Sequence, residues 1–183
     1  MSLDLYGPEF FEGRTGPLLS SISVIVPVLV AGLQPKSMLD LGCGQGEWVE
    51  AFRQQGVFSV GVDISAPEGE GYRRHDLTEP LDLGWDYDMV LCLETGEHLP
   101  EDAADTLVDT ACWHSDTIVF SAAVVGQEGI GHINCQPHEY WHDKFEDRGY
   151  RVYDSVRPLI QSPAVSPWYR DNIFVYWSPS NGL

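Results

Sequence analysis

The order of its apolar and glycine-rich segments predicts that this chain folds as a doubly wound α/β domain. Short apolar runs of strand length alternate with stretches of helical periodicity, which is typical of a parallel sheet covered by helices. The first run ends in three glycines, Gly42, Gly44 and Gly46, directly before a helical pattern. The 183 residues suit one domain with a substantial core, so we assign residues 1–183 to a single domain.

The N-terminal third is expected to supply a cap and the first strand-turn-helix unit. Residues 1–35 are assigned to a capping segment and a helix, because 3–14 mixes aromatic and turn residues and 17–33 is apolar at helical spacing. Proline at a first helical position favours a start at Pro17, and Pro27 could kink the helix. The expected helices are 17–33, 47–55, 100–112 and 137–148.

The strands are predicted from apolar runs bounded by turn residues. The run 87–94 is almost entirely apolar, as a central parallel strand should be. Residues 65–71 are too short and too rich in glycine for a crossover helix, and we expect loops at 124–136 and at the proline-rich 157–171. The expected strands are 38–41, 59–63, 72–75, 87–94, 117–123, 151–156 and 172–177.

The composition limits the partners of the protein. A formal net charge of −18 would repel a phosphate backbone or an anionic membrane, so we expect neither nucleic acid nor membrane as a partner. The most apolar run, 24–31, is interrupted by Pro27 and is shorter than the about 20 residues that a bilayer requires. Four scattered cysteines and the absence of a secretory leader favour reduced thiols in the cytoplasm.

The glycine turn predicts a ligand that approaches bare backbone. Glycine allows the angles of a tight strand-to-helix turn, and the amides at the helix start then face the ligand. A dinucleotide fingerprint would be Gly-x-Gly-x-x-Gly, whereas position 47 is Glu. A pyrophosphate would sit poorly beside Asp40 and Glu47, and a cationic nucleoside that carries an amino acid would sit well. Asp63 ends the second strand, where a carboxylate can bind ribose hydroxyls.

The heptad Asp40-Leu-Gly-Cys-Gly-Gln-Gly46 resembles motif I of the class I S-adenosylmethionine (SAM) dependent methyltransferases. The resemblance implies a Rossmann-like doubly wound sheet of seven strands, the last antiparallel, with helices on both faces. It also implies SAM as cofactor, with Asp76 in the position of the acid that accepts a hydrogen bond from the adenine amino group. The full set of expected cofactor-binding residues is Asp40, Gly42, Cys43, Gly44, Gly46, Trp48, Asp63, Ile64, Asp76, Leu77, Leu93 and Glu94.

The segment Glu94-Thr-Gly-Glu-His98 follows the fourth strand at the expected site mouth and is the first place to look for chemistry. It could position the cofactor and cap a helix, as it often does in the wider family. Alternatively, His98 could be a general base with Glu97 beside it. The same segment resembles the metal-binding segment of some small-RNA and ubiquinone-pathway O-methyltransferases, so a divalent cation on Glu94, Glu97 and His98 is possible, although we do not favour it.

The loop 126–136 offers the other catalytic candidate, His132, as a base or a further metal ligand. If the loop runs extended, His132, Asn134 and Gln136 lie on the same side. His138 and His142 are expected to be surface residues and not a metal clasp. The cluster Trp168-Tyr169-Arg170 could form a lid wall, with arginine holding an anionic group, or could simply anchor a packed loop.

The sequence therefore predicts a SAM-dependent methyltransferase of a small-molecule acceptor, such as a sugar or another metabolite, with transfer to oxygen. The catalytic candidates are His98, His132 and Glu97. A non-catalytic SAM-binding scaffold or partner subunit would keep the same cofactor motif and is an open alternative. An NAD-binding oxidoreductase is a weaker one, because the dinucleotide fingerprint is missing. The sequence does not fix the acceptor or the oligomeric state.

Overall fold

The computed structural model describes residues 15–179, which contain one seven-stranded sheet with the order β3-β2-β1-β4-β5-β7-β6. Strand β7 is antiparallel to both of its neighbours, and the other pairs are parallel. This is the predicted doubly wound topology. The strands are β1 (Ser37–Leu41), β2 (Phe58–Asp63), β3 (Tyr72–Arg74), β4 (Met89–Leu93), β5 (Thr117–Ser121), β6 (Arg151–Tyr153) and β7 (Phe174–Trp177).

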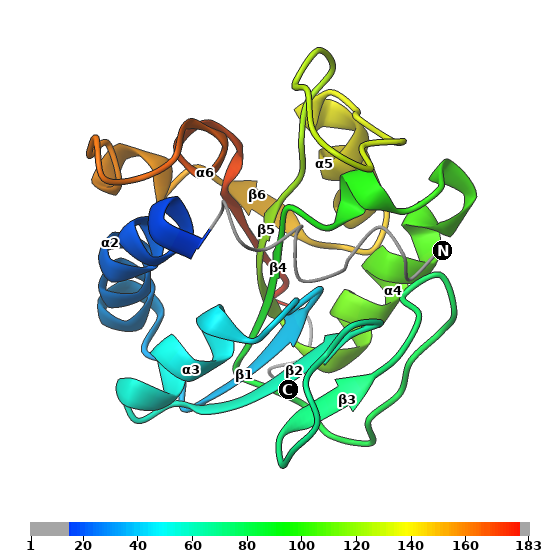
Figure 1. Ribbon diagram of the computed structural model, residues 1–183. Coiled ribbons are helices and arrows are strands. Elements are labelled where there is room, and N and C mark those ends of the chain that lie inside the picture. The colour runs from blue at the N-terminus through cyan, green and yellow to red at the C-terminus, as the bar shows by residue number, and fades with distance from the viewer. Residues whose placement is uncertain (1–14, 180–183) are drawn as a thin grey trace.

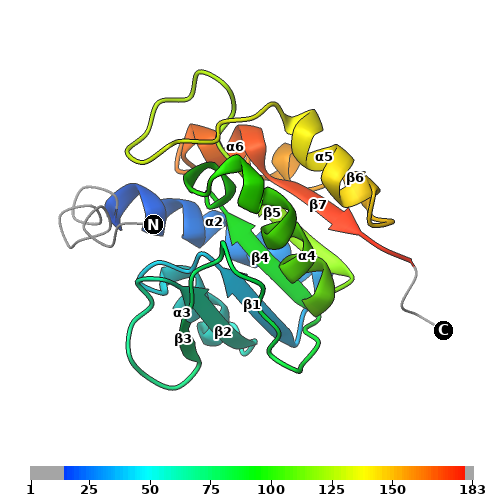
Figure 2. The same cartoon turned by 90° about the vertical axis from the view of Figure 1, so that its right-hand side faces the viewer.

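Helices cover both faces of the sheet (Figures 1 and 2). On one face α2, α3 and α6 pack against the strands, and on the other face α4 and α5 do so. Three short 3₁₀ turns, η2 (Gly96–His98), η3 (Glu101–Ala103) and η4 (Arg157–Leu159), complete the connections. The helices are α2 (Thr15–Leu33), α3 (Glu47–Gln54), α4 (Ala104–His114), α5 (His138–Glu146) and α6 (Pro167–Asn172).

The central strands are buried because both of their faces are covered. Every residue of β4 is buried, as its nearly continuous apolar sequence predicts. Strand β1 sends Met38 toward α2 and α3, whereas Leu39 and Leu41 face the layer of α4 and α5. Alternation of side chains along a strand thus divides one five-residue segment between two hydrophobic clusters.

Helix α2 packs on the sheet through one side and continues through Pro27. Ile22, Ile25 and Leu29 are buried in the cluster with α3. By length and composition, the window Gly16–Leu33 would be sufficient to cross a membrane, and 28% of it is buried. This window is longer than the run 24–31 on which the expectation of no membrane span was based. Buried core helices pass the same test, so the observation is weak evidence for a membrane partner.

The predicted elements and the observed ones differ most near the C-terminus. The segment 157–171 was expected to be a loop, but it contains η4 and the start of α6. Strand β7 begins at Phe174 and not at 172, because Asn172 ends α6. Residues 65–71 form turns without a helix, as predicted. The capping segment expected at 3–14 lies outside the described residues.

Candidate functional site

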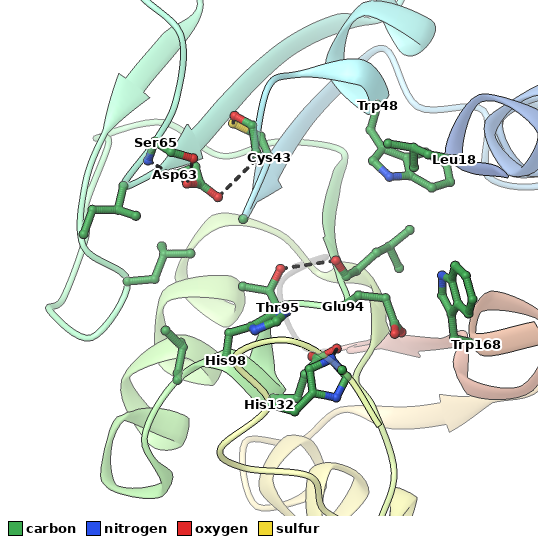
Figure 3. Close-up of a pocket in the computed structure, with 18 of the residues that line it drawn as sticks. Leu18, Cys43, Trp48, Asp63, Ser65, Glu94, Thr95, His98, His132 and Trp168 are labelled. Carbon is green, nitrogen blue, oxygen red and sulfur yellow. Dashed lines mark hydrogen bonds and ion pairs between the residues drawn. The ribbon is translucent and has the colours of Figure 1, made fainter. Parts of the chain in front are cut away.

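A pocket of about 330 Å³ opens at the carboxyl ends of the parallel strands (Figure 3). The segments 42–48, 63–65, 76–77, 93–99, 127–132 and 168–169 contribute to it, and the beginning of α2 adds two further residues. In Figure 3, Cys43, Asp63 and Ser65 lie on one side of the pocket, and Leu18, Trp48 and Trp168 lie on the opposite side. We call the first side, with Gly42–Gly44, Glu47, Asp63–Ser65, Asp76 and Leu77, the cofactor end. The acceptor end comprises Pro17, Leu18, Trp48, Glu94, Glu97, His98, Gln127–Gly129, His132, Trp168 and Tyr169.

The glycines of the turn after β1 are required by their backbone angles and by close packing. The φ angles of Gly42, Gly44 and Gly46 are +86°, +53° and +91°, in the left-handed region that side chains rarely adopt. A Cβ at Gly42 would overlap the side chain of Thr95, and one at Gly46 would overlap the ring of Tyr72. The predicted strand-turn-helix unit is therefore held against β4 at one end and β3 at the other.

The acids of the cofactor end are fixed by short-range hydrogen bonds. Asp63 accepts a bond of 3.1 Å from the amide of Gly44, and the amide and hydroxyl of Ser65 donate to its other oxygen at 2.7 and 2.8 Å. Asp76 accepts bonds from the amide and hydroxyl of Thr78 at 3.0 and 2.8 Å. These bonds, the backbone one first, lower the pKa of Asp76, so the carboxylate is charged at neutral pH.

The structure places most of the predicted cofactor-binding residues on the pocket wall. Two of the predicted residues do not line it: Asp40 and Gly46. Asp40 is buried behind the turn, where burial, and then the charges of Asp63 and Glu47, raise its pKa well above the usual range. The predicted residues that do line the pocket are Gly42, Cys43, Gly44, Trp48, Asp63, Ile64, Asp76, Leu77, Leu93 and Glu94.

Glu94, at the acceptor end, has a strained backbone conformation. Its φ is +52°, which is unusual for a residue with a side chain and is found most often at functional sites. The hydroxyl of Ser121 donates to one carboxylate oxygen at 2.8 Å, and the amide of Gln127 donates to the other at 3.2 Å. Burial outweighs these bonds and raises the pKa of Glu94 to about 7.

Glu97, His98 and His132 converge on one point of the acceptor end. One ligand atom from each lies within 4.8 Å of the others, and the two imidazole rings meet edge to face at 5.0 Å between centroids. Neither carboxyl oxygen of the fully buried Glu97 has a partner in good hydrogen-bond geometry, and Nε2 of His132 lies 4.0 Å away. The side chain of Glu94 and the backbone amides of Glu97 and Ala123 are its other polar neighbours. Burial, and then the charge of Glu94, raise the pKa of Glu97 well above its usual range.

Backbone carbonyl groups orient both imidazoles. Nδ1 of His98 lies 3.1 Å from the carbonyl oxygen of Gly131, and Nδ1 of His132 lies 3.1 Å from that of Gln127. Because a carbonyl oxygen only accepts hydrogen bonds, each Nδ1 must carry the proton. The neutral tautomer of His132 therefore presents an Nε2 lone pair on the side of Glu97, where it can take a proton or bind a cation.

The loop after β5 does not run extended as expected. The amides of Ile133 and Asn134 both donate to the carbonyl oxygen of Glu97, at 2.9 and 3.0 Å, which turns the chain back after His132. As a result Asn134 and Gln136 bond to each other at 2.8 Å and do not line the pocket, so the prediction that they share a side with His132 is wrong.

The two histidines of α5 are half-buried and not surface residues. His138 bonds to the Asn172 side chain at 3.1 Å, and His142 bonds to the hydroxyl of Tyr176 at 2.7 Å. Burial, and then His138, lower the pKa of His142. Both rings therefore join α5 to the C-terminal strand region, as expected of structural residues and not of a metal clasp.

Aromatic side chains form the outer wall of the acceptor end. Trp48 and Tyr169 meet edge to face at 5.5 Å between centroids, and Trp168 lies 6.1 Å from Tyr169. Trp168 lines the pocket although 40% of its surface is exposed. Of the two alternatives for the cluster Trp168-Tyr169-Arg170, the lid wall agrees with the positions of Trp168 and Tyr169, whereas Arg170 does not line the pocket.

The sequence reasoning missed several lining residues that come from distant parts of the chain. Leu18 was interpreted as core, and Gln127 and Glu128 were treated as part of a loop without a role. Ser166 before Pro167 is a signal for a helix start that could have revealed α6, which carries Trp168 and Tyr169. No local signal places Pro17 and Leu18 beside that helix. The additional lining residues are Pro17, Leu18, Glu47, Ser65, Thr95, Leu99, Gln127, Glu128 and Gly129.

Comparison with known proteins agrees with this site. A family model described as a methyltransferase domain matches residues 18–117. A ubiquinone biosynthesis O-methyltransferase of Saccharophagus degradans is 31% identical over 87 residues, which cover 40% of this chain and 37% of that protein. The chain thus spans less than two fifths of the length of this curated relative.

Two solved structures have the same fold. The magnesium protoporphyrin IX methyltransferase of Synechocystis PCC 6803, with bound SAM, superposes with a TM-score of 0.67 at 18% identity, over 96% of this chain and 88% of that one. The sugar N-methyltransferase KedS8 of Streptoalloteichus superposes with a TM-score of 0.69 at 16% identity, over 97% and 93% of the two chains.

Proposed function

This chain belongs to the class I SAM-dependent methyltransferase family, and we propose that it transfers the methyl group of SAM to a hydroxyl group of a small molecule. The net charge of −18 argues against a nucleic-acid acceptor. The pocket volume of about 330 Å³ favours a small acceptor, because the cofactor must share this space. The observation that carries the proposal is the buried carboxyl group of Glu97 beside two imidazoles at the acceptor end.

The cofactor end has the groups that a SAM molecule requires. Asp63 is the candidate for the ribose hydroxyls, and Asp76 is the candidate for the adenine amino group. The bare backbone of Gly42 and Gly44 lets the amino-acid part of the cofactor approach β1 closely. With the cofactor in this orientation, the sulfonium methyl group would face the acceptor end, where Glu97 and His132 lie.

The acceptor end can supply a general base. Methyl transfer is an in-line displacement in which the acceptor oxygen forms a bond to the methyl carbon as the bond from carbon to sulfur breaks, and S-adenosylhomocysteine leaves. His132 takes the hydroxyl proton at Nε2. The carboxyl group of Glu97 lies 4.0 Å away, and its raised pKa keeps it protonated until an imidazolium beside it favours the charged form. His98 packs edge to face against His132 and is the alternative base.

Methyl transfer from isotopically labelled SAM into a panel of hydroxylated metabolites tests this proposal. Replacing the base in His132→Ala should reduce kcat by about 10²–10⁴-fold. His138→Ala is the matched control, because His138 is half-buried but lies outside the pocket. Equal turnover by His132→Ala and the wild type would remove His132 from the mechanism. Binding of SAM without transfer to any acceptor would favour a non-catalytic scaffold.

A second candidate mechanism uses a divalent cation held by Glu97, His98 and His132. The residues fit such a group, because two imidazoles are oriented by carbonyl oxygens and a buried carboxylate has no other partner. Nitrogen and carboxylate ligands suit Zn²⁺, Mn²⁺ and related ions. A bound cation would lower the pKa of a hydroxyl that it coordinates. Glu94, bonded to Ser121 and Gln127, would be a less available ligand.

Calorimetric titration of Mg²⁺, Mn²⁺ and Zn²⁺ into the protein distinguishes the two mechanisms. A cation that is part of the site should bind with a stoichiometry of one, lose its affinity in Glu97→Gln, and restore activity after treatment with a chelator. Base catalysis by His132 predicts no such binding and full activity in the presence of the chelator.

A further inference from the structure

The charge of the pocket restricts the kind of acceptor that it can hold. Among the described residues that line it there is no lysine or arginine. Six carboxylates line it: Glu47, Asp63, Asp76, Glu94, Glu97 and Glu128. Three of these, Glu94, Glu97 and Glu128, belong to the acceptor end. Burial raises the pKa of Glu94 and Glu97, so both groups resist a negative charge. An anionic substituent would lie beside these two buried carboxyl groups and the exposed Glu128, and no lysine or arginine among the described lining residues would offset its charge.

The bound cofactor does not reverse this balance. SAM carries a sulfonium, an ammonium and a carboxylate, and so brings one net positive charge to the pocket. The cofactor end alone has three acids, Glu47, Asp63 and Asp76, to offset that charge. The acceptor would still face the buried carboxyl group of Glu97, which has no hydrogen-bond partner, and the exposed Glu128 at the mouth.

The aromatic wall of the acceptor end favours a flat apolar group. Trp48 and Tyr169 are buried and meet edge to face, whereas Trp168 keeps an accessible ring surface on the pocket. Aromatic rings stack on such a surface in offset or edge contacts. The wall is also held in place by two hydrogen bonds between α2 and Ser166. The hydroxyl of Ser21 donates to the hydroxyl of Ser166 at 3.3 Å and accepts a bond from the amide of Ser166 at 3.0 Å.

We propose that the acceptor is a ring-bearing hydroxyl compound without an anionic substituent, neutral or cationic, which stacks against Trp168. This inference rests on the proposed function and narrows its acceptor. It excludes phosphorylated, sulfated, carboxylated and nucleotide-linked compounds. It applies to the mechanism in which a base activates the hydroxyl, because a divalent cation on Glu97, His98 and His132 would itself attract an anionic substituent.

Three catechols that differ mainly in the charge of one substituent test the proposal: 4-methylcatechol, dopamine and 3,4-dihydroxybenzoate. Their affinities for the protein saturated with S-adenosylhomocysteine are measured by calorimetry. The neutral and cationic compounds should bind at least about tenfold more tightly than the carboxylate, because like charges in a poorly solvated site repel. Equal or tighter binding of 3,4-dihydroxybenzoate would show that the pocket does not exclude anionic substituents. If none of the three catechols binds, the proposal that the acceptor carries a ring would be wrong.

A charge-reversal variant sharpens the test. Glu128→Lys should raise the affinity for 3,4-dihydroxybenzoate about tenfold and leave that for 4-methylcatechol unchanged. Asp86→Lys is the control, because it makes the same charge change at an exposed position. Asp86 precedes β4 and so lies near the amino ends of the parallel strands, away from the pocket. An equal gain in both variants would contradict a local effect of the pocket.

The affinity for S-adenosylhomocysteine, measured first in the same experiment, separates this inference from the proposed function. Failure of the cofactor product to bind would count against the proposed function itself. Normal cofactor binding with a preference for the anionic catechol would count against this inference alone.

Discussion

The two ends of the pocket satisfy their charged groups in different ways. At the cofactor end, Asp63 and Asp76 accept hydrogen bonds from residues two positions away, and Asp63 also accepts one from the neighbouring turn. At the acceptor end, Glu97 is buried without such a partner, and Glu94 is held in a left-handed conformation. The acids Asp63 and Asp76 are therefore satisfied by groups of the protein itself, whereas the acceptor end keeps a buried acid without such bonds.

This contrast separates residues that stabilise the fold from residues that cost stability. A buried carboxyl group without partners destabilises the protein and is retained where it serves function. Substitutions at the cofactor end should therefore damage folding and cofactor binding together. Substitutions at the acceptor end should damage turnover while the protein becomes equally or more stable.

The largest expected effect is that of Glu97→Gln. The amide cannot accept a proton or stabilise an imidazolium, so kcat should fall by about 10²–10⁴-fold. The melting temperature should stay the same or rise, because a buried ionisable group has been removed. Parallel measurements of turnover and thermal unfolding check both parts. Full activity, or a large loss of stability, would contradict the assignment of Glu97 to the acceptor end.

The next effect in size is that of Gly42→Ala at the cofactor end. The new Cβ would overlap Thr95, and the φ of +86° adds strain, so we expect a loss of roughly 4 kcal/mol in the free energy of unfolding. Gly56→Ala is the matched control, since its φ is +80° but nothing lies within 4 Å of the new atom. That variant should lose about 1 kcal/mol. Denaturant unfolding compares the two, and similar losses would show that contact with Thr95 does not matter.

Acid titration gives a third test, through the raised pKa of Glu94. In the folded protein this group keeps its proton up to about pH 7, whereas in the unfolded chain it loses it near pH 4.5. The folded state binds more protons over this window, so its stability is highest below pH 4.5 and decreases as the pH rises to 7. Between pH 4.5 and 7, deprotonation of Glu94 should lower the free energy of unfolding by roughly 3 kcal/mol. Glu94→Gln should flatten the slope of unfolding free energy against pH, and an unchanged slope would contradict the raised pKa.

The smallest effect is expected where α2 meets α6. Ser21→Ala removes the bonds to Ser166 and should cost about 1 kcal/mol of stability. It should also raise the KM for the acceptor more than that for SAM, because Leu18 and Trp168 stand on the two helices. Ser23→Ala is the control on the same helix, with an exposed hydroxyl that bonds to Ser20. Initial-rate kinetics on both variants measure the difference. If Ser21→Ala and Ser23→Ala have the same KM for the acceptor, the contact between Ser21 and Ser166 does not affect acceptor binding.

The cofactor end was largely predictable from the sequence because its signals are local. The glycines after β1 and the acid at the end of β2 follow from strand-turn-helix geometry, and the structure brings them together. Asp40 was assigned to the pocket by its motif but lies behind it, since a residue inside β1 faces a packed layer. Gly46 is required by Tyr72 packing and does not line the pocket.

The acceptor end was harder to predict because its parts meet through tertiary packing. Ser21 and Ser166, which join the two helices of its wall, are 145 residues apart. The direction of His132 depends on amides of its loop that bond to the carbonyl oxygen of Glu97. The alternation of side chains along an extended strand predicts neither the contact between Ser21 and Ser166 nor the direction of His132. Chemistry-bearing residue types indicated His98 and His132, but their convergence on Glu97 is visible only in three dimensions.

The most direct test of the account is a crystal structure with bound S-adenosylhomocysteine. We predict the ribose hydroxyls at Asp63, the adenine near Asp76 and the sulfur atom facing the space beside Glu97 and His132. A cofactor product bound elsewhere, or bound with its sulfur atom turned away from these two side chains, would contradict the assignment of the two ends.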